Sequence, residues 1–151
     1  MPGSLRYRAI AVRVVAEACR LISRPELESD AAAPGYDLTH PFDSAVVSAF
    51  AEIFNNIAIH AYGRRDTGLP IDLALWIEPD GITIELRDQG SPFEIADVPT
   101  PSLDELHEGG MGIHIARSLL DRVEYEPGPP NLWRLYKRLA VEEARPSVVT
   151  R

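Results

Sequence analysis

The sequence contains one cysteine, Cys19, so an internal disulfide is impossible, and it has no CxxC or Cys/His spacing for a structural zinc ion. No apolar run approaches the ~18 residues of a membrane span. At the N-terminus arginines interrupt the apolar residues, whereas a signal peptide has an unbroken hydrophobic block. We therefore expect a cytoplasmic protein without a membrane segment, in which Cys19 is a buried free thiol.

Basic residues are also scarce, because 15 Lys and Arg stand against 23 Asp and Glu, for a net charge of -8. Phosphate backbones attract basic surfaces, so this balance disfavours direct nucleic-acid binding. Positions 25–60 contain no Lys or Arg. The first 24 residues contain a single acid, Glu17, and five arginines: Arg6, Arg8, Arg13, Arg20 and Arg24. This cluster is either solvated surface or a docking face for an acidic partner.

The rest of the composition is that of a globular protein, with 45% hydrophobic and 25% charged residues. A chain of 151 residues fits one domain with one core. We expect this domain to cover residues 1–140 and the tail over 141–151 to be flexible, as chain ends often are.

Apolar residues spaced three and four positions apart predict a first helix over about residues 7–23. Prolines and an internal Pro-Gly pair predict a connecting loop over 24–41. A second helix is predicted over 42–62 by the same apolar periodicity. Gly63 would end it, since glycine adopts the left-handed cap at little cost.

Alternating apolar residues in 71–77 and 82–86, separated by Pro-Asp-Gly, predict a β-hairpin. The acidic, Pro- and Gly-rich stretch 90–112 is longer than most connections in a compact domain, so it is either disordered or a functional lid. A third helix is predicted over 113–123, with Ile115, Leu119 and Leu120 facing inward. Two strands joined by a Gly/Pro turn should follow over 123–139.

Glu52 and Asn56 lie four residues apart in the second predicted helix, so they project from the same side. An isolated pair of this kind is usually a solvated carboxylate beside a surface or capping amide. Carboxylate and carboxamide oxygens also suit a magnesium nucleotide site, because Mg²⁺ takes oxygen ligands and keeps several waters. A free carboxylate near that site could accept a proton from an attacking hydroxyl or position a water.

Two further motifs have chemistry that suits a nucleotide. Asp88 follows the second hairpin strand, and an ionised Asp accepts hydrogen bonds from an exocyclic amine such as that of adenine. Gly90 would let a flat ring approach the backbone, although Asp-x-Gly after a strand is most often a turn. Gly109, Gly110 and Gly112 precede a helix, and they form either an anion cradle or a flexible hinge. Neither a Rossmann fingerprint nor a Walker A loop is present.

The order of these motifs is more specific than any one of them: Glu-x-x-x-Asn on a helix, a hairpin ending in Asp-x-Gly, a long loop, then Gly-x-Gly before a helix. In EIFNNIAIHAY, RDQGSPFE and SLDELHEGGMGIHIARSLLDRVEY the chain resembles the GHKL ATPase superfamily, which has the Bergerat fold. Within that superfamily it is similar to the anti-sigma factor serine kinases of bacterial partner-switching systems, over roughly residues 40–138. The resemblance implies an α/β (α+β) two-layer sandwich with a mixed, mostly antiparallel sheet and helices on one face.

The resemblance also implies roles for individual residues. Glu52 matches a catalytic or water-positioning glutamate, Asn56 a magnesium-binding asparagine, and Asp88 the aspartate that binds the adenine amine. The expected cofactors are therefore ATP and Mg²⁺, and residues 94–109 match the ATP lid. The positions expected around the nucleotide are Gly90, Gly110, Met111 and Gly112.

Three features depart from the family pattern. The lid contains no Lys or Arg between Phe93 and His107, so a cationic contact to the γ-phosphate must come from elsewhere. The loop over 24–41 is longer than such kinases need. The first strand, which these domains use for dimerisation, has only Leu5 to Tyr7 as a candidate, which leaves homodimer formation open.

The resemblance implies an ATP-dependent protein serine kinase with two protein partners. One is a sigma factor or another regulatory protein that the kinase sequesters, and the other is a small antagonist protein that accepts the phosphoryl group on Ser or Thr. The alternative from another class is a non-catalytic module that binds ATP as a switch and acts only by association. An autophosphorylating histidine kinase is a poorer option, because it needs a separate helical dimerisation domain.

Overall fold

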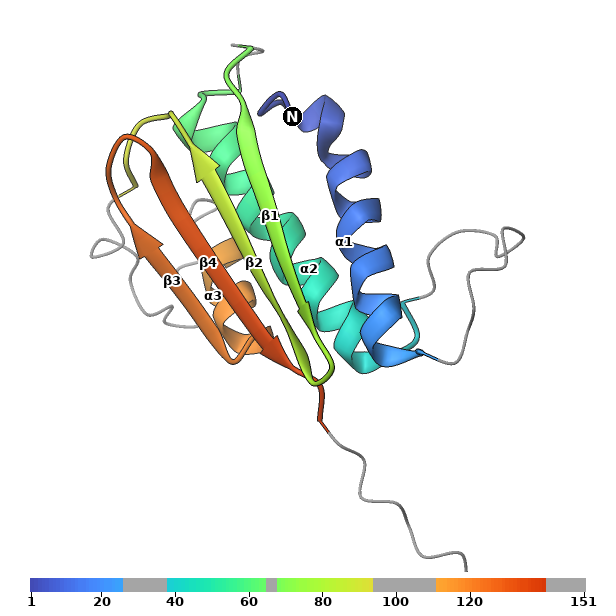
Figure 1. Cartoon of the computed structure of the whole chain (residues 1–151). Coiled ribbons are helices and arrows are strands. Elements are labelled where there is room, and N and C mark those ends of the chain that lie inside the picture. The colour runs from blue at the N-terminus through green and yellow to red at the C-terminus, as the bar shows by residue number, and fades with distance from the viewer. Residues whose placement is uncertain (26–37, 65–67, 94–110, 141–151) are drawn as a thin grey trace, which may run out of the picture.

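A four-stranded sheet and a layer of helices that covers one of its faces make up the fold (Figure 1). The computed structural model describes residues 1–25, 38–64, 68–93 and 111–140. In chain order the elements are α1 (Arg8–Ser23), α2 (Pro41–Asn56), β1 (Ile71–Glu78), β2 (Gly81–Asp88), α3 (Met111–Leu119), β3 (Arg122–Glu126) and β4 (Asn131–Arg138). The predicted two-layer α+β architecture is confirmed.

The strands pair in the order β1-β2-β4-β3, and each pair of neighbours is antiparallel. The predicted hairpin is β1 and β2, with Pro79 and Asp80 in the turn. Because side chains alternate between the two faces of a strand, Ile82, Ile84 and Leu86 of β2 all point toward the helices, where they are buried. The centre of the hydrophobic core therefore lies between β2, β4 and the helical layer.

Helix α1 packs beside α2, and one side of it is buried, as its apolar spacing predicted. Cys19 lies on that side and is fully buried. Burial, with a smaller contribution from the nearby Asp43 carboxylate, raises the pKa of the Cys19 thiol to about 12. The thiol is therefore neutral at physiological pH, and the prediction of a buried free cysteine is confirmed.

Helix α2 begins with Pro41, at a position where the missing N–H costs no hydrogen bond. His40 caps the helix, because its ring Nδ1 accepts a hydrogen bond from Phe42 N at 3.3 Å. After Asn56 the chain continues in a π-helical turn, Ile57–Ala61, and Gly63 follows in the left-handed region at φ 62. The helix predicted over 42–62 is confirmed, except that its last part is wound more widely.

One described helical segment, Pro41–Ala61, is long and apolar enough to cross a membrane by length and composition alone, with a hydropathy of 1.2. However, 61% of its most apolar window is buried inside the structure. Since a core helix passes the same test, burial against α1, α3 and the sheet accounts for its apolar side chains.

The N-terminus corrects one prediction. Leu5–Tyr7, the candidate for a first strand, form a short 3-10 turn in which the Ser4 hydroxyl accepts a hydrogen bond from Arg6 N. This cap starts the helical region immediately, so no strand forms there. The first residues instead run alongside the beginning of β1, where Gly3 N donates to Leu69 O at 2.8 Å.

Helix α3 is shorter than predicted, because it ends at Leu119 and Val123 belongs to β3. Its fully buried residues are Ile113 and Ala116, whereas Ile115, which was predicted to face inward, is only partly buried. Contacts between α2 and α3 explain the difference, since Gly112 of α3 lies against Glu52 and Asn56 of α2 and so fixes which side of α3 faces the core.

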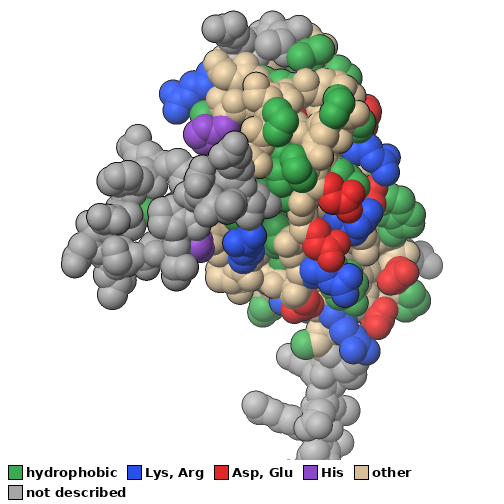
Figure 2. Space-filling view, turned by 90° about the vertical axis from the view of Figure 1, so that its left-hand side faces the viewer, with side chains coloured by type: hydrophobic (Ala, Val, Ile, Leu, Met, Phe, Trp, Pro, Cys, Tyr) green, Lys and Arg blue, Asp and Glu red, His purple; other side chains and the backbone are tan. Residues whose placement is uncertain are grey.

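Acidic and basic side chains are interspersed over the edge of the sheet that β3 forms (Figure 2). Arg134 of β4 lies 2.9 Å from Glu85, 3.4 Å from Glu124 and 3.7 Å from Glu126. Arg87 also pairs with Glu85, which is only 6% exposed although it lies on the outer face of the sheet. Opposite charges therefore balance on this face, and these residues form no basic patch of the kind that binds nucleic acids.

Candidate functional site

Glu52 and Asn56 meet Gly112 of α3. A Cβ on Gly112 would lie 2.8 Å from Glu52 Oε2 and 3.4 Å from Asn56 Nδ2. The glycine therefore leaves room for both side chains, which project from the same side of α2 as their spacing predicted. Asn56 Nδ2 is buried and has no hydrogen-bond partner among the described residues. A buried amide without an acceptor is rare, so this nitrogen is a candidate contact for a ligand atom.

Asp88 lies at the end of β2 and is only 1% exposed. Its Oδ1 accepts hydrogen bonds from Gly90 N and Asn131 Nδ2, both at 2.9 Å. Burial raises the pKa of the Asp88 carboxyl, while these two hydrogen bonds act in the opposite direction. Because both donors use Oδ1, Oδ2 takes no part in these contacts, and a carboxylate held in this way can accept a hydrogen bond from a ligand amine.

Asn131 is a site residue that the sequence-based prediction missed. Its Nδ2 donates to Asp88 Oδ1 and, at 3.0 Å, to Gly90 O, and its Oδ1 accepts from Gly128 N at 3.1 Å. It lies directly opposite Asp88 in the pairing of β2 with β4. The sequence contained one signal for this role. Asn131 is polar although it shares the inward-facing side of its strand with Trp133 and Leu135.

We expect Asn131→Ala to lower the free energy of unfolding by about 2–4 kcal/mol, because buried groups on several partners would lose their hydrogen bonds. Urea denaturation of the two proteins measures this difference. Gln89→Ala is the matched control, since the Gln89 side chain is exposed and its loss should change stability by no more than about 0.5 kcal/mol. If both substitutions lowered the free energy of unfolding equally, Asn131 would not be the residue that fixes the Asp88 carboxylate and Gly90 in place.

Gly90 packs against the π-helical turn that follows α2. A Cβ at this position would lie 2.6 Å from the Ala61 carbonyl oxygen, and Ser91 N donates to that same oxygen at 3.2 Å. The structure thus gives a reason for glycine that the sequence did not, namely a close approach of two backbone segments. Contact between Gly90 and a nucleotide stays a prediction.

An aromatic cluster closes the space between Asp88 and Asn56. The ring of Phe93 lies 6.5 Å from that of Tyr125 and 6.3 Å from that of Trp133, and Phe93 N donates to the Tyr125 hydroxyl at 2.7 Å. The cavity that both Asp88 and Asn56 line measures only about 10 Å³, which is room for roughly one water. Asn56 and Asp88, the two halves of the predicted site, therefore line one cavity, and the described residues around it leave little space.

Other predicted residues lie elsewhere. Gly110 and the lid over 94–109 fall outside the described residues. Met111 is the first residue of α3 and is 43% exposed. The hydroxyl of Tyr62 donates to Pro70 O at 2.7 Å and accepts from Gln89 N at 3.1 Å, so it ties the end of the π-helical turn to both ends of the hairpin.

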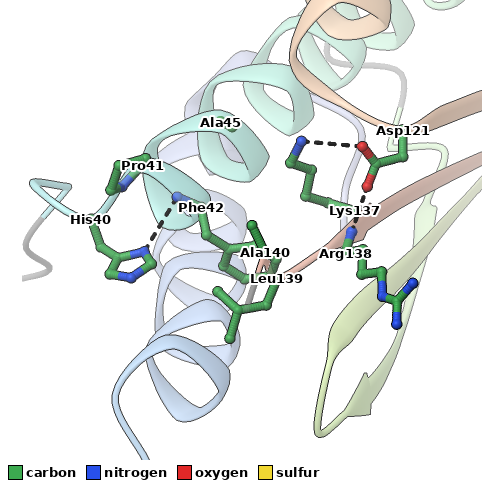
Figure 3. Close-up of a pocket in the computed structure, with 9 residues that line it drawn as sticks. All are labelled: His40, Pro41, Phe42, Ala45, Asp121, Lys137, Arg138, Leu139 and Ala140. Carbon is green, nitrogen blue, oxygen red and sulfur yellow. Dashed lines mark hydrogen bonds and ion pairs between the residues drawn. The ribbon is translucent and has the colours of Figure 1, made fainter. Parts of the chain in front are cut away.

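A much larger cavity, of about 630 Å³, lies at the other end of α2, where that helix begins and β4 ends (Figure 3). Its wall is largely apolar, with Phe42 and Leu139 among its residues, and Lys137 at its rim pairs with Asp121 at 3.3 Å. None of the predicted site residues that the structure describes lines this cavity. The larger volume of this cavity therefore does not make it the candidate site, because the predicted polar residues Asn56 and Asp88 line the smaller cavity.

Known proteins with similar sequences include bacterial kinases. The serine-protein kinase RsbW of Bacillus licheniformis is 30% identical over 86 residues, which are 52% of this chain and 53% of that protein. The serine-protein kinase RsbW of Oceanobacillus iheyensis is 27% identical over 103 residues, 63% of this chain and 65% of that protein. The chain thus spans between half and two thirds of the length of these curated relatives.

A solved structure shares the fold. The histidine kinase domain of a blue-light activated histidine kinase from Erythrobacter litoralis EL346 superposes with a TM-score of 0.53, covering 92% of this chain and 62% of that one at 16% identity. The family described as histidine kinase-like ATPase domain matches residues 2–134. Fold, motif order and family match agree, and the predicted resemblance to the GHKL superfamily is confirmed: the chain belongs to the histidine kinase-like ATPase domain family.

Proposed function

We propose that this protein is an ATP-dependent protein serine kinase that also sequesters a regulatory protein. The observation that carries the proposal is the convergence of Glu52, Asn56 and Gly112, because Asn56 also lines the same cavity as Asp88. The family match, and relatives named serine-protein kinase RsbW, support it. The partners we propose are a sigma factor or similar regulatory protein and a small antagonist protein, in the cytoplasm.

The chemistry of Asn56 and Glu52 fits a magnesium nucleotide. Asn56 Oδ1 would offer an oxygen to Mg²⁺, and Nδ2 of the same amide, which has no hydrogen-bond partner among the described residues, would donate to a phosphate oxygen. When bound, Mg²⁺ would neutralise charge on the phosphates. Asp88 Oδ2 would accept a hydrogen bond from the adenine amine, while Oδ1 accepts the hydrogen bond from Asn131 Nδ2.

Glu52 is the proposed catalytic residue. In the transfer step the hydroxyl oxygen of an acceptor serine attacks the γ-phosphorus, the bond to the β,γ-bridging oxygen breaks, and ADP leaves with that oxygen. Glu52 accepts the proton from the serine hydroxyl. Its half-buried position on a rigid helix suits this role, because precise placement of the reacting groups provides much of the rate enhancement in phosphoryl transfer.

We propose that the Phe93 side chain moves when a nucleotide binds. Ligand pockets usually have volumes of about 300–1,000 Å³, whereas the cavity between Asn56 and Asp88 measures about 10 Å³. Phe93 packs against three aromatic rings at one wall of that cavity, and it directly precedes the segment predicted to be the lid. Displacement of this side chain is therefore part of the proposed binding step.

Gly112→Ala tests whether the contact between α3 and Glu52 is functional. The new Cβ would displace the flexible carboxylate of Glu52, so we expect phosphoryl transfer to fall by up to about 100-fold, because small misplacements are that costly. The fold should tolerate the change, since alanine favours a helix over glycine by up to about 1 kcal/mol. Turnover of ATP and urea unfolding together measure the two effects.

Gly90→Ala is the contrasting variant, because its Cβ would meet backbone rather than a flexible side chain. It should lower the unfolding midpoint clearly, whereas Gly112→Ala should not. Full activity of the Gly112→Ala protein would contradict the proposed position of the catalytic carboxylate.

The second candidate is a switch module that binds ATP without transferring phosphate. It is favoured by one observation: among the described residues that line the small cavity there is no Lys or Arg to contact the phosphates. Incubation with γ-labelled ATP, Mg²⁺ and the small proteins encoded beside its gene separates the candidates. A labelled phosphoserine on one of those proteins supports the kinase, whereas saturable ATP binding with no labelled protein supports the switch.

A further inference from the structure

The large cavity where α2 begins and β4 ends takes no part in the proposed kinase reaction, and we call it the α2–β4 cavity. Its volume of about 630 Å³ falls within the range of about 300–1,000 Å³ that is typical of small-molecule sites. Apolar side chains form much of its wall, from the first turns of α2 and from the chain just after β4 (Figure 3). The α2–β4 cavity therefore has the size and the lining of a ligand pocket.

Hydrogen bonds within the protein hold both walls of the α2–β4 cavity in place. On the α2 side, His40 caps the helix by accepting a hydrogen bond from Phe42 N. On the β4 side, Leu139 N donates to a carbonyl in the β1–β2 turn at 2.8 Å, and Arg138 N donates to Asp121 Oδ2 at 2.7 Å. The cavity is thus formed before a ligand enters, which reduces the entropy lost on binding.

Lys137 lines the α2–β4 cavity and is the one lysine among the 15 Lys and Arg residues of the sequence. Because alternate residues of a strand share a face, Lys137 lies on the same side of β4 as the buried Trp133 and Leu135. Figure 3 shows its side chain leading from β4 into the cavity, with the ammonium turned toward Asp121. The core-facing row of β4 therefore ends in a compact charged donor at the cavity.

The charges around this ammonium are already balanced. Lys137 Nζ donates to Asp121 Oδ1 at 3.3 Å, and no other described residue accepts from it, so two of its three N–H groups can donate to a ligand. The hydrogen bond from Arg138 N lowers the pKa of the Asp121 carboxyl, which is therefore ionised at neutral pH. The Arg138 guanidinium pairs elsewhere, with Asp80 at 3.3 Å. A charged ligand would thus be repelled by one member of the Lys137–Asp121 pair.

We propose that the α2–β4 cavity binds a neutral, mostly apolar small molecule whose carbonyl oxygen accepts a hydrogen bond from Lys137 Nζ. The apolar body of this ligand would lie against Phe42, Ala45 and Leu139, where it is removed from water. A neutral carbonyl can accept from the ammonium while Asp121 stays in place. This inference goes beyond the proposed kinase function and does not depend on the nucleotide site.

The probes are three molecules of nearly equal size and different charge: octanamide, octanoate and octylammonium. Titration of the full chain, followed through backbone amide signals in ¹H–¹⁵N NMR spectra, gives the Kd of each probe. We expect octanamide to bind at least about fivefold more tightly than either charged probe. The signals that shift should include those of Ala45 and Leu139, on the two walls of the cavity.

Two substitutions test the role of the ion pair. Lys137→Met keeps the aliphatic stem but leaves Asp121 without its cation, so octylammonium should become the tightest of the three probes. Asp121→Asn keeps an oxygen for Arg138 N but leaves Lys137 unbalanced, so octanoate should become the tightest. Partition of the probes onto any apolar surface would give one order of affinities in all three proteins. Both side chains are partly exposed, so the variants should fold as the wild type does.

Arg122→Met is the matched control, because Arg122 belongs to a different ion pair, with Glu124 at 3.8 Å, and does not line the cavity. It should keep the wild-type preference for octanamide. Ala45→Phe fills the cavity and should weaken octanamide by at least about tenfold. The thermal shift with Mg-ATP should persist in this variant, since Ala45 does not line the small cavity. Absence of that shift in the wild type would count against the nucleotide site and leave the probe results standing.

The inference would be overturned if octanamide did not bind at millimolar concentration, if the order of affinities were the same in the wild type and both ion-pair variants, or if Ala45→Phe bound octanamide as the wild type does. Binding that appears only after removal of residues 141–151 would also overturn it, because the occupant would then be the tail. A dimer in sedimentation experiments that Ala45→Phe dissociates would assign the cavity to a second copy of the chain instead.

Discussion

Glu52→Gln is expected to reduce phosphoryl transfer by about 10²–10⁴-fold, the range that a positioned general base contributes. The amide keeps the size of the carboxylate, so the contact with Gly112 remains, but it cannot accept the proton of the attacking serine. The Kd for Mg-ATP should stay as in wild type. Single-turnover transfer from γ-labelled ATP and calorimetric titration with ATP measure the two quantities separately.

The control for this prediction is Glu78→Gln, at the exposed end of β1, which removes one carboxylate from the protein surface. It should leave both transfer and binding unchanged. A Glu52→Gln protein that phosphorylates its acceptor at the wild-type rate would exclude Glu52 as the catalytic residue. A parallel loss of ATP affinity would show instead that Glu52 acts in binding.

Asp88→Asn is expected to weaken ATP binding by about 10- to 150-fold, which corresponds to the loss of one hydrogen bond to a charged group. Asn keeps an oxygen that can accept from Gly90 N and Asn131 Nδ2, so the local structure should persist. The direct readout is the thermal shift that Mg-ATP produces, which should disappear at ATP concentrations that saturate the wild type. Asp72→Asn, at an exposed position of β1, should keep the full shift.

The same variant should behave differently without nucleotide. Burial raises the pKa of Asp88 above its value in the unfolded chain. The stability contribution of such a group is fully present below the unfolded pKa and is lost as the pH rises through the folded pKa. The ionised Asp88 therefore costs folding free energy near neutral pH, and Asp88→Asn should raise the melting temperature of the ATP-free protein there.

This gain should shrink as the pH falls toward about 4, because below that pH the carboxyl becomes protonated in the unfolded state as well as in the folded state. Differential scanning calorimetry of both proteins across that range measures it. A melting temperature for Asp88→Asn below that of wild type near pH 7 would mean that the hydrogen bonds of the carboxylate outweigh its desolvation. Buried charge that lowers stability is typical of functional sites.

Local patterns in the sequence were sufficient for most of the elements. Alternating Ile and Leu around Pro79 and Asp80 specified the hairpin, because side-chain period and turn chemistry act within a few residues. Apolar periodicity likewise located α1 and α2. The boundaries of α3 were predicted less well, since the end of that helix depends on where β3 pairs with β4 rather than on helical spacing.

The sequence by itself determined that Glu52 and Asn56 share one side of a helix and that Asp88 ends a strand, and its resemblance to a known family predicted the α+β fold. Only the tertiary structure decided that Gly112 lies against Glu52, that Asn131 holds Asp88 from a strand 43 residues away, and that Phe93 lines the cavity beside Trp133. The physical reason is range: propensity and periodicity act between near neighbours, whereas these contacts depend on how helices pack and in which register distant strands pair.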